Sequence, residues 1–330
     1  MLRMTELYWI KAAISCPSTI CEWKMSVIVV FGGTGFLGRR LVQRLAADGT
    51  PVRVAVRHPE GARSALPAAD LAQITLVRAD VRDQASVAAA IEGVDAVINA
   101  VSAYVEKGDV TFESVHVQGA ETVAREAVRL GIARLVLISG LGADPQSRST
   151  YIRSRGCGEL AVQQAFPDAT IVRPSAMFGP GDALFGTLAD LARLLPVLPL
   201  IGGGHTRLQP VYVEDVAEAV ARILADPGTI GRTYEFAGPS VYTLRDLVRF
   251  TLRVVGKRRL LIPVSFKVAE IQAWLLEFLP RPPLTTSQVD LLKADSVASG
   301  AMPGFPELDI RPRAIEDVVP TYIGRSLCGV

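Results

Sequence analysis

The stretch VVFGGTGFLGRRLVQRL, residues 29–45, decides the fold, because it places a glycine-rich turn between a strand pattern and a helix pattern. Its glycines form Gly-x-x-Gly-x-x-Gly. The first glycine allows a tight bend, the second lets a pyrophosphate approach the backbone, and the third lets the helix pack closely. The N–H groups that open the helix then face the anion. The residues predicted to touch a dinucleotide here are Gly32, Thr34, Gly35, Phe36, Leu37, Gly38 and Arg39.

Up to about residue 175, short apolar runs alternate with alanine- and leucine-rich helical stretches. Gly49, Gly93 and Gly131 close three of these stretches, as expected at helix ends. Strands that are apolar on both faces and joined by helices indicate a parallel sheet covered on both sides. We therefore predict the α/β class, with a Rossmann-type doubly wound parallel sheet and a smaller C-terminal lobe. The expected strands are SVIVVFG, VRVAVR, ITLVRAD, DAVINAV, RLVLISG and ATIVRPS.

Composition and charge exclude several other classes. The 35 basic and 33 acidic residues leave a formal net charge of +2, which gives no reason to expect nucleic acid as a partner. No apolar run is long enough for a membrane span, so any membrane contact is expected to be peripheral. The four cysteines lack the spacing of a zinc site, which favours reduced thiols and predicts no metal site.

The chain divides into three predicted parts. Residues 1–24 have no uninterrupted apolar centre and no clear cleavage site, which predicts a loosely ordered extension rather than a signal peptide. Residues 25–240 are predicted to form an NAD(P)-binding Rossmann domain, with lobe insertions after about residue 175, where glycine and proline become frequent. Residues 241–330 are predicted to form a C-terminal lobe of the kind that binds a substrate or docks a partner.

The residue that ends the second strand run favours one nicotinamide cofactor over the other. An acidic residue there would bind the ribose 2′-hydroxyl, but VAVRHPE places Arg57 at that position. A guanidinium suits a 2′-phosphate, and Arg39 supplies a second positive group. The predicted cofactor is therefore NADPH. The alternative is that Arg57 is an ordinary solvated strand end.

Two further stretches are predicted to lie beside the adenosine half of the nucleotide. RADVRD ends the third strand run with a carboxylate that can accept a hydrogen bond from the adenine amino group. NAVSAY ends the fourth run and places its backbone near the ribose. The residues concerned are Asp80, Val81, Asn99, Ala100 and Val101.

Several motifs in a fixed order carry a family resemblance. GGTGFLG, ADVRD, VRPSAMFGPGD and QPVYVEDVAEAV resemble the extended or atypical short-chain dehydrogenase/reductases. ISGLGADPQSRSTYIRSRGCGE, QAWLLEFLPRPPLTTSQVDLLKADSV and RPRAIEDVVPTYI are similar to the atypical branch that contains the NAD(P)H-binding accessory subunit of respiratory complex I and its bacterial relatives. The resemblance implies a partnership with other complex I subunits. It also implies a peripheral place on the cytoplasmic face of a bacterial inner membrane, or on the matrix face in a mitochondrion.

Active members of this superfamily use Ser, Tyr and Lys, with Tyr-x-x-x-Lys on one helix face. The lysine lowers the pKa of the tyrosine and binds the nicotinamide ribose. Here Ser139 and Tyr151 are present, but Arg155 takes the lysine position, and a planar guanidinium does not replace an ammonium. We therefore expect no independent catalysis, with these three residues and Pro174 lining the nucleotide. His116 stands where an asparagine is expected and is more often a structural residue than a base.

The stretch PVSFKVAEIQAWLLEFLP, residues 263–280, predicts a helix with a narrow charged arc. Lys267, Glu270 and Glu277 share one side, and Trp274 projects into that side. Such a helix is in the core of the lobe, faces a partner or lies at a membrane interface. The leading hypothesis is an accessory subunit that holds NADPH as a structural or sensing ligand. The alternatives are an active NADP-dependent reductase or epimerase and a free NADP-responsive regulator.

Overall fold

The computed structural model describes residues 27–66, 72–278 and 284–324, so the predicted extension 1–24 lies outside the described residues. At its centre is a seven-stranded sheet in the order β11-β6-β5-β4-β1-β2-β3, with every pair parallel. The predicted fold class is confirmed. The strands are β1 (Ile28–Phe31), β2 (Val52–Val56), β3 (Ile74–Arg78), β4 (Ala96–Asn99), β5 (Arg134–Ile138), β6 (Thr170–Pro174) and β11 (Thr233–Phe236).

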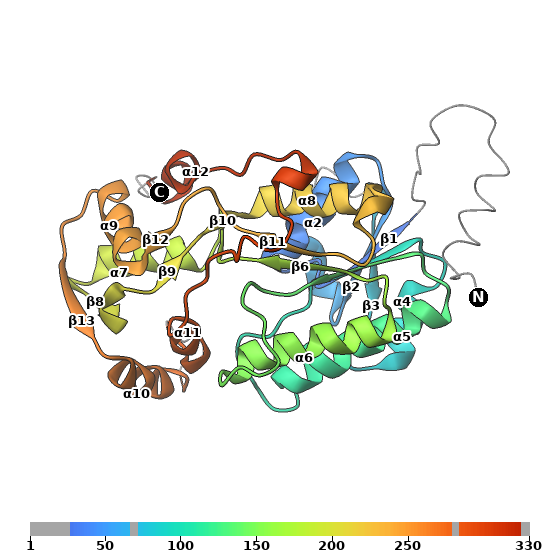
Figure 1. Cartoon of the computed structure of the whole chain (residues 1–330), viewed down its shortest axis with the longest axis horizontal. Helices are drawn as coiled ribbons and strands as arrows, with labels where there is room; N and C mark the ends of the chain where they lie inside the picture. The colour runs from blue at the N-terminus through green and yellow to red at the C-terminus, as the bar shows by residue number, and fades with distance from the viewer. Residues whose placement is uncertain (1–26, 67–71, 279–283, 325–330) are drawn as a thin grey trace.

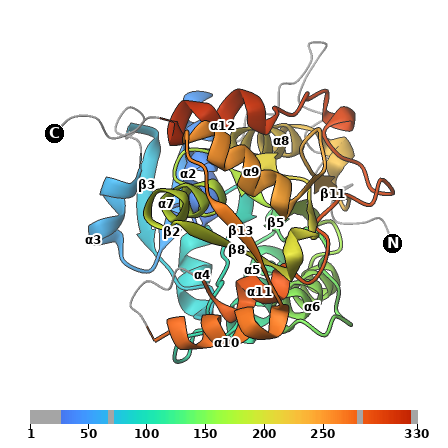
Figure 2. The same cartoon turned by 90° about the vertical axis from the view of Figure 1, so that its left-hand side faces the viewer.

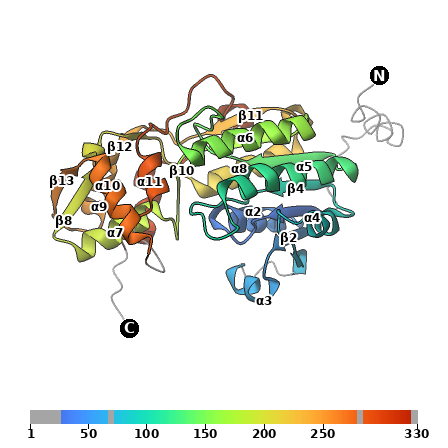
Figure 3. The ribbon, with the colours of Figure 1, turned by 90° about the horizontal axis from the view of Figure 1, so that it is seen from below.

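Helices cover both faces of this sheet, as Figure 1 and Figure 3 show. Two of them lie on one face, and three lie on the other. Each face encloses its own cluster of buried apolar side chains, which is why the central strands are apolar on both sides. The first pair is α2 (Phe36–Ala47) and α8 (Val213–Ala225), and the other three are α4 (Gln84–Ile91), α5 (Ala120–Arg129) and α6 (Thr150–Ala165).

The strand order reverses at β1, which pairs with β2 on one side and β4 on the other. Phe31, at the end of β1, lies opposite Asn99, at the end of β4, and its carbonyl accepts a hydrogen bond from Ala100 N–H at 3.0 Å. In such a sheet the connections leave in opposite directions at the reversal, and a crevice is expected at the carboxyl ends of the strands. In open α/β sheets this crevice is where the ligand binds.

A lobe beyond the carboxyl edge is assembled from segments on both sides of residue 240, and Figure 2 shows it from its outer end. β8 (Val197–Ile201) pairs with β13 (Leu260–Val264) in parallel, and β9 (Arg207–Leu208) pairs with β12 (Tyr242–Thr243). β7 (Met177–Phe178) and β10 (Val211–Tyr212) form a short link at its base. The lobe helices are α7 (Leu184–Leu194), α9 (Leu244–Val254), α10 (Phe266–Leu276), α11 (Thr286–Leu291) and α12 (Ile315–Ile323). Shorter helical elements are α3 (Pro59–Ala62), η1 (Arg63–Ala65), η3 (Glu113–Gly119), η4 (Gly202–Gly204), η5 (Pro227–Thr229) and η6 (Pro306–Leu308).

Helix α10 forms where the sequence predicts a helix, but it is not a core helix. Only Ala269 and Ala273 are buried, whereas Ile271, Trp274 and Leu275 have 56–60% of their surface exposed. The two alanines and the partly buried Phe266 attach the helix to the lobe, and the other large apolar side chains named here stay exposed. Among the described residues, no helix combines the length and the apolar character that a membrane span needs.

Candidate functional site

The glycine turn has the geometry that the sequence predicts. Gly32 has φ of +75°, and a Cβ there would lie 2.7 Å from Ala100 O. A Cβ on Gly38 would lie 2.0 Å from Gly32 O, so only glycine lets α2 begin against this turn. Gly35 N–H donates to Gly32 O at 3.0 Å, which closes the turn, and Gly35 itself is exposed. The turn therefore presents bare backbone to the crevice.

The start of α2 fits an anionic ligand. No side chain caps this helix, and no acidic residue lies in its first turn. Arg39 lies one turn further along, with its guanidinium carbon 5.6 Å from the centre of the Phe36 ring. Within the described part of the chain, the buried Nε of Arg39 has no hydrogen-bond partner. Free N–H groups at a helix start and an unpartnered guanidinium nitrogen together favour a phosphate group.

The adenosine side of the crevice carries the other predicted residues. Asn99 is buried, and its Oδ1 accepts a hydrogen bond from Val101 N–H at 3.2 Å, which turns the chain away from β4 beside Gly32. Arg57 directly follows β2 and is exposed, and its charge is the last of the causes that lower the pKa of Asp80. Contact of these residues with the nucleotide stays a prediction.

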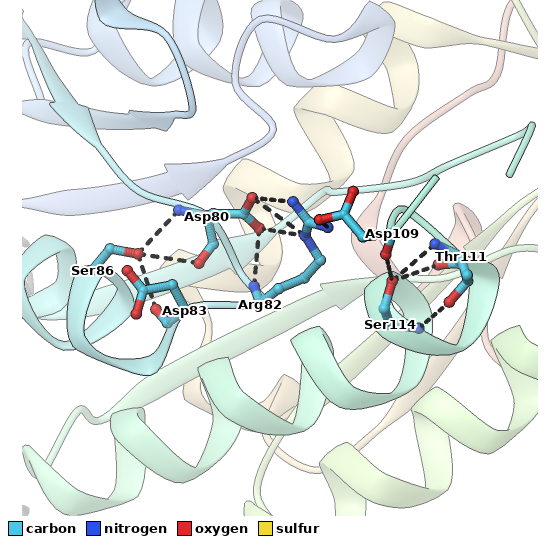
Figure 4. Close-up of polar contacts among 7 residues, drawn as sticks. All are labelled: Asp80, Arg82, Asp83, Ser86, Asp109, Thr111 and Ser114. Carbon is cyan, nitrogen blue, oxygen red and sulfur yellow. Dashed lines mark hydrogen bonds and ion pairs between the residues drawn. The ribbon is translucent and has the colours of Figure 1, made fainter. Parts of the chain in front are cut away.

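Asp80 follows β3 at the same edge, and its carboxylate is already bound by a neighbour, as Figure 4 shows. Arg82 donates to it from Nη2 at 2.7 Å, from Nε at 3.0 Å and from its backbone N–H at 3.0 Å. These hydrogen bonds lower the pKa of Asp80. Arg82 also pairs with Asp109 at 2.8 Å and so ties this edge to the loop before η3. The adenine contact of Asp80 stays a prediction, and it would have to share the carboxylate with Arg82.

The pair at the Tyr-x-x-x-Lys position is buried beneath the lobe. Arg155 donates to Tyr151 Oη from Nε at 3.4 Å and from Nη2 at 3.3 Å. It also donates to Ser102 Oγ at 2.6 Å and to Ile138 O at 3.1 Å. All three guanidinium nitrogens are therefore engaged by the protein. An ammonium has one nitrogen and would be free to turn toward a ribose, whereas this planar group is held by four hydrogen bonds to three acceptors.

His116 lies behind Tyr151 in the π-helical turn η3. Its Nε2 accepts a hydrogen bond from Ala103 N–H at 3.0 Å, so the proton is on Nδ1, which donates to Ser154 Oγ at 2.9 Å. Ser154 Oγ in turn donates to Tyr151 O at 2.8 Å. Burial, with the charge of Arg155 as a second cause, lowers the pKa of His116 to about 3. His116 is therefore a neutral structural residue in this site.

Ser139 directly follows β5 and is buried with 5% of its surface exposed. Its N–H donates to Val172 O at 2.7 Å, while its Oγ has no hydrogen-bond partner among the described residues. Pro174 closes the neighbouring strand and accepts a hydrogen bond from Leu141 N–H at 2.9 Å. An unpartnered buried hydroxyl at this edge is suited to a ligand oxygen.

Three residues of this site were not predicted from the sequence. Ser102 binds Arg155, Ser154 binds His116, and Arg82 binds Asp80. Ser102 and Ser154 lie 53 and 38 residues from their partners, so no local spacing reveals them. Arg82 lies within two residues of Asp80 in RADVRD, and that short spacing was the available signal.

A crevice at a topological switch point, bare glycine backbone and an uncapped helix start are the requirements for binding a dinucleotide. Combined with a Tyr-x-x-x-Arg pair above them, they define a nicotinamide nucleotide-binding protein of the short-chain dehydrogenase/reductase type. The NAD dependent epimerase/dehydratase family matches residues 28–237. The chain belongs to this family.

Individual relatives narrow the branch. The chain is 35% identical over 302 residues to NADH dehydrogenase (ubiquinone) 1 alpha subcomplex subunit 9, mitochondrial, of Arabidopsis thaliana, which covers 88% of this chain and 75% of that protein. It is 33% identical over 240 residues to ceramide reductase of Caulobacter vibrioides, and the match covers 72% of this chain and 73% of that protein. The fold is similar to that of DesIV, a dTDP-glucose 4,6-dehydratase of Streptomyces venezuelae, with a TM-score of 0.68 and 23% sequence identity. The match covers 90% of this chain and 95% of that protein.

Proposed function

We propose that this chain is an NADPH-binding accessory subunit of respiratory complex I that holds its nucleotide as a structural or sensing ligand. The similarity to the Arabidopsis thaliana subunit supports the assignment, because it covers the lobe as well as the nucleotide-binding domain. The single observation that carries the absence of turnover is Arg155, whose guanidinium is bound to Tyr151, Ser102 and Ile138 at once. When bound, the nucleotide would supply a reducible nicotinamide, but this arginine is not free to orient its ribose.

The preference for NADPH is supported by the two cations at the adenosine end. Arg57 is exposed at the end of β2, where NAD-specific proteins carry an acid. Arg39 has an unpartnered buried nitrogen in the described part of the chain. A 2′-phosphate that reaches a guanidinium group gains charge-assisted hydrogen bonds that a 2′-hydroxyl does not form.

The proposed attachment is peripheral, through contacts with other complex I subunits. Its proposed side is the cytoplasmic face of a bacterial inner membrane, or the matrix face in a mitochondrion. The nucleotide would support assembly indirectly, because a ligand that binds only the folded state stabilises that state.

Co-migration tests the proposal. The chain carries a tag at its C-terminus, membranes are solubilised in mild detergent, and NADH–quinone activity is followed through native separation. We expect the tag to migrate with that activity. Gly38→Ala places a Cβ 2.0 Å from Gly32 O in the nucleotide-binding turn and should lower the co-migrating fraction. Gly61→Ala, where a Cβ meets no atom within 4 Å, should leave that fraction unchanged. If the tagged chain migrates alone while complex I stays intact, the assignment is wrong and the free regulator is favoured.

A reductase is the second candidate, and two observations favour it. Ser139 Oγ is buried without a partner in the described residues, and Tyr151 lines an open cleft, so two of the three catalytic groups are placed for a carbonyl substrate. Similarity to the Caulobacter vibrioides ceramide reductase points to a lipid carbonyl. Oxidation of NADPH by the pure protein in the presence of a ceramide precursor ketone would favour this candidate.

A further inference from the structure

A cleft of about 670 Å³ separates the lobe from the nucleotide-binding domain. Helices α10 and α11 form one wall, and the start of α6 with the loop before η3 forms the other. Its volume falls in the usual range of small-molecule sites, roughly 300–1,000 Å³. The cleft is made by this chain alone, so an inference about its ligand goes beyond the proposed role in complex I and does not depend on it.

Part of the cleft is aromatic and apolar. Tyr151 and Phe112 form the wall on the nucleotide-binding domain, with their rings edge to face at 5.5 Å. Ile271 and Trp274 form the opposite wall on α10. Thr150, next to Tyr151, adds a hydroxyl to the wall that carries the phenol. A hydrocarbon chain can therefore lie between two apolar walls and bring a polar end toward the tyrosine.

The charges of the cleft exclude phosphate-bearing ligands. Among the described residues that line it, four are carboxylates, those of Glu106, Glu270, Glu277 and Asp290, and one is a cation, Lys293. Lys293 is bound by Glu270 at 2.5 Å and by Asp290 at 2.6 Å, so its charge is already neutralised. A diphosphate would lie among these carboxylates, and no described residue of the lining offers it an unpaired cation. Coulomb repulsion of this kind disfavours a nucleotide sugar.

The apolar wall continues out of the cleft onto the surface of α10. Ile271 and Trp274 line the cleft and are themselves 60% and 57% exposed. Leu275, one helical turn from Ile271, is 56% exposed. These side chains form a path along which a hydrocarbon chain stays in apolar contact as it enters from outside.

We propose that this cleft binds an amphiphile without negative charge, whose chain lies on Ile271 and Trp274 and whose polar end reaches Thr150 and Tyr151. The ligand class follows from two properties that act together. The α10 wall and the aromatic residues hold a hydrocarbon chain, and the carboxylates reject acids and phosphates of the same chain length.

Trp274 is a natural reporter for this binding. The chain has three tryptophans, at positions 9, 23 and 274, so Trp9→Phe with Trp23→Phe leaves Trp274 as the only one. This full-length double variant is titrated below micelle-forming concentrations with monododecanoylglycerol, with dodecyl phosphate and with UDP-glucose. We expect a saturable blue shift of the emission with monododecanoylglycerol, at least tenfold weaker binding of dodecyl phosphate, and no shift with UDP-glucose.

A matched pair of variants locates the site. Ile271→Asp places a fifth carboxylate on the apolar wall and should weaken binding of monododecanoylglycerol at least tenfold. Val268→Asp adds the same charge to the same helix outside the cleft lining and should change the affinity less than twofold. Both positions are exposed, so the fold tolerates the change, and circular dichroism confirms it.

Three results would overturn the proposal. The first is absence of a saturable shift with monododecanoylglycerol, and the second is equal or tighter binding of dodecyl phosphate or UDP-glucose. The third is an equal loss of affinity in Val268→Asp and Ile271→Asp, which would assign the effect to the outer surface of α10 instead of the cleft. None of these results bears on co-migration with complex I, so the two proposals fail separately.

Discussion

Arg155 and Tyr151, one helical turn apart on α6, form a closed pair in which Nε and Nη2 of the arginine lie 3.4 and 3.3 Å from the phenolic oxygen. The remaining guanidinium hydrogen bonds extend to the end of β5 and to the loop after β4. The arginine thus fastens α6 to the carboxyl edge of the sheet. Active family members carry a lysine ammonium at this position. This chain carries an arginine whose hydrogen bonds to Tyr151, Ser102 and Ile138 O hold α6 in place, and we call this set of contacts the clamp.

The clamp predicts a loss of stability without a gain of activity when lysine is restored. Arg155→Lys cannot reach Tyr151, Ser102 and Ile138 O together, so buried acceptors lose their donors. We expect the free energy of unfolding to fall by about 1–3 kcal/mol in urea titrations. NADPH oxidation with small carbonyl substrates should stay absent. Arg148→Lys, at an exposed position, is the control. Robust turnover by the unmodified protein would contradict the structural role.

Arg57 predicts the cofactor preference. We expect calorimetry to show NADPH binding more tightly than NADH, and Arg57→Glu to remove the difference by placing like charge beside the 2′-phosphate. Loss of one charge-assisted hydrogen bond corresponds to at least about tenfold in affinity. Arg258→Glu, an exposed cation of the lobe, should keep the preference. Equal affinities in the unmodified protein would show that Arg57 is only a solvated strand end.

His116 predicts a pH dependence of stability. Its folded pKa of about 3 lies below the unfolded value near 6.5, so the unfolded state binds more protons in between. The stability that neutral His116 contributes is complete above pH 6.5 and is lost as the pH falls. Between pH 7 and pH 5 this loss is about 2 kcal/mol. In urea titrations, the free energy of unfolding of His116→Asn should fall between pH 7 and pH 5 by about 2 kcal/mol less than that of the unmodified protein. The same decrease in both proteins would contradict the buried neutral histidine.

The close contact of Gly38 with the glycine turn predicts that a side chain at this position lowers both stability and NADPH affinity. In Gly38→Ala the new Cβ would lie 2.0 Å from Gly32 O, so α2 must move away from the turn. We expect a loss of about 1–3 kcal/mol in stability and at least tenfold weaker NADPH binding by calorimetry. Gly61→Ala meets no atom within 4 Å and should change stability by less than about 0.5 kcal/mol. Unaltered binding by Gly38→Ala would show that α2 can shift without cost.

The lobe shows where the sequence left the outcome open. Residues 263–280 predict a helix, and α10 forms, but its burial was left open between the core, a partner and a membrane surface. Burial depends on which other elements pack against a helix, and in α10 only Ala269 and Ala273 become buried. The lobe insertions expected after about residue 175 are a similar case, because only the structure shows that β13 pairs with β8, about sixty residues earlier in the chain. Periodicity describes one segment at a time and does not specify its neighbours.

The sequence by itself determined the parallel sheet and the glycine turn. Both depend on local properties: strands apolar on two faces must be covered twice, and Gly32 and Gly38 are needed where a Cβ would meet the backbone. It also identified Arg155 as a departure from the family pattern. Only the tertiary structure decided what that arginine does, because Ser102 and Ile138 O come from other strand ends. Contacts between residues far apart in the chain are set by packing, and packing also left α10 exposed and formed the cleft beside Tyr151.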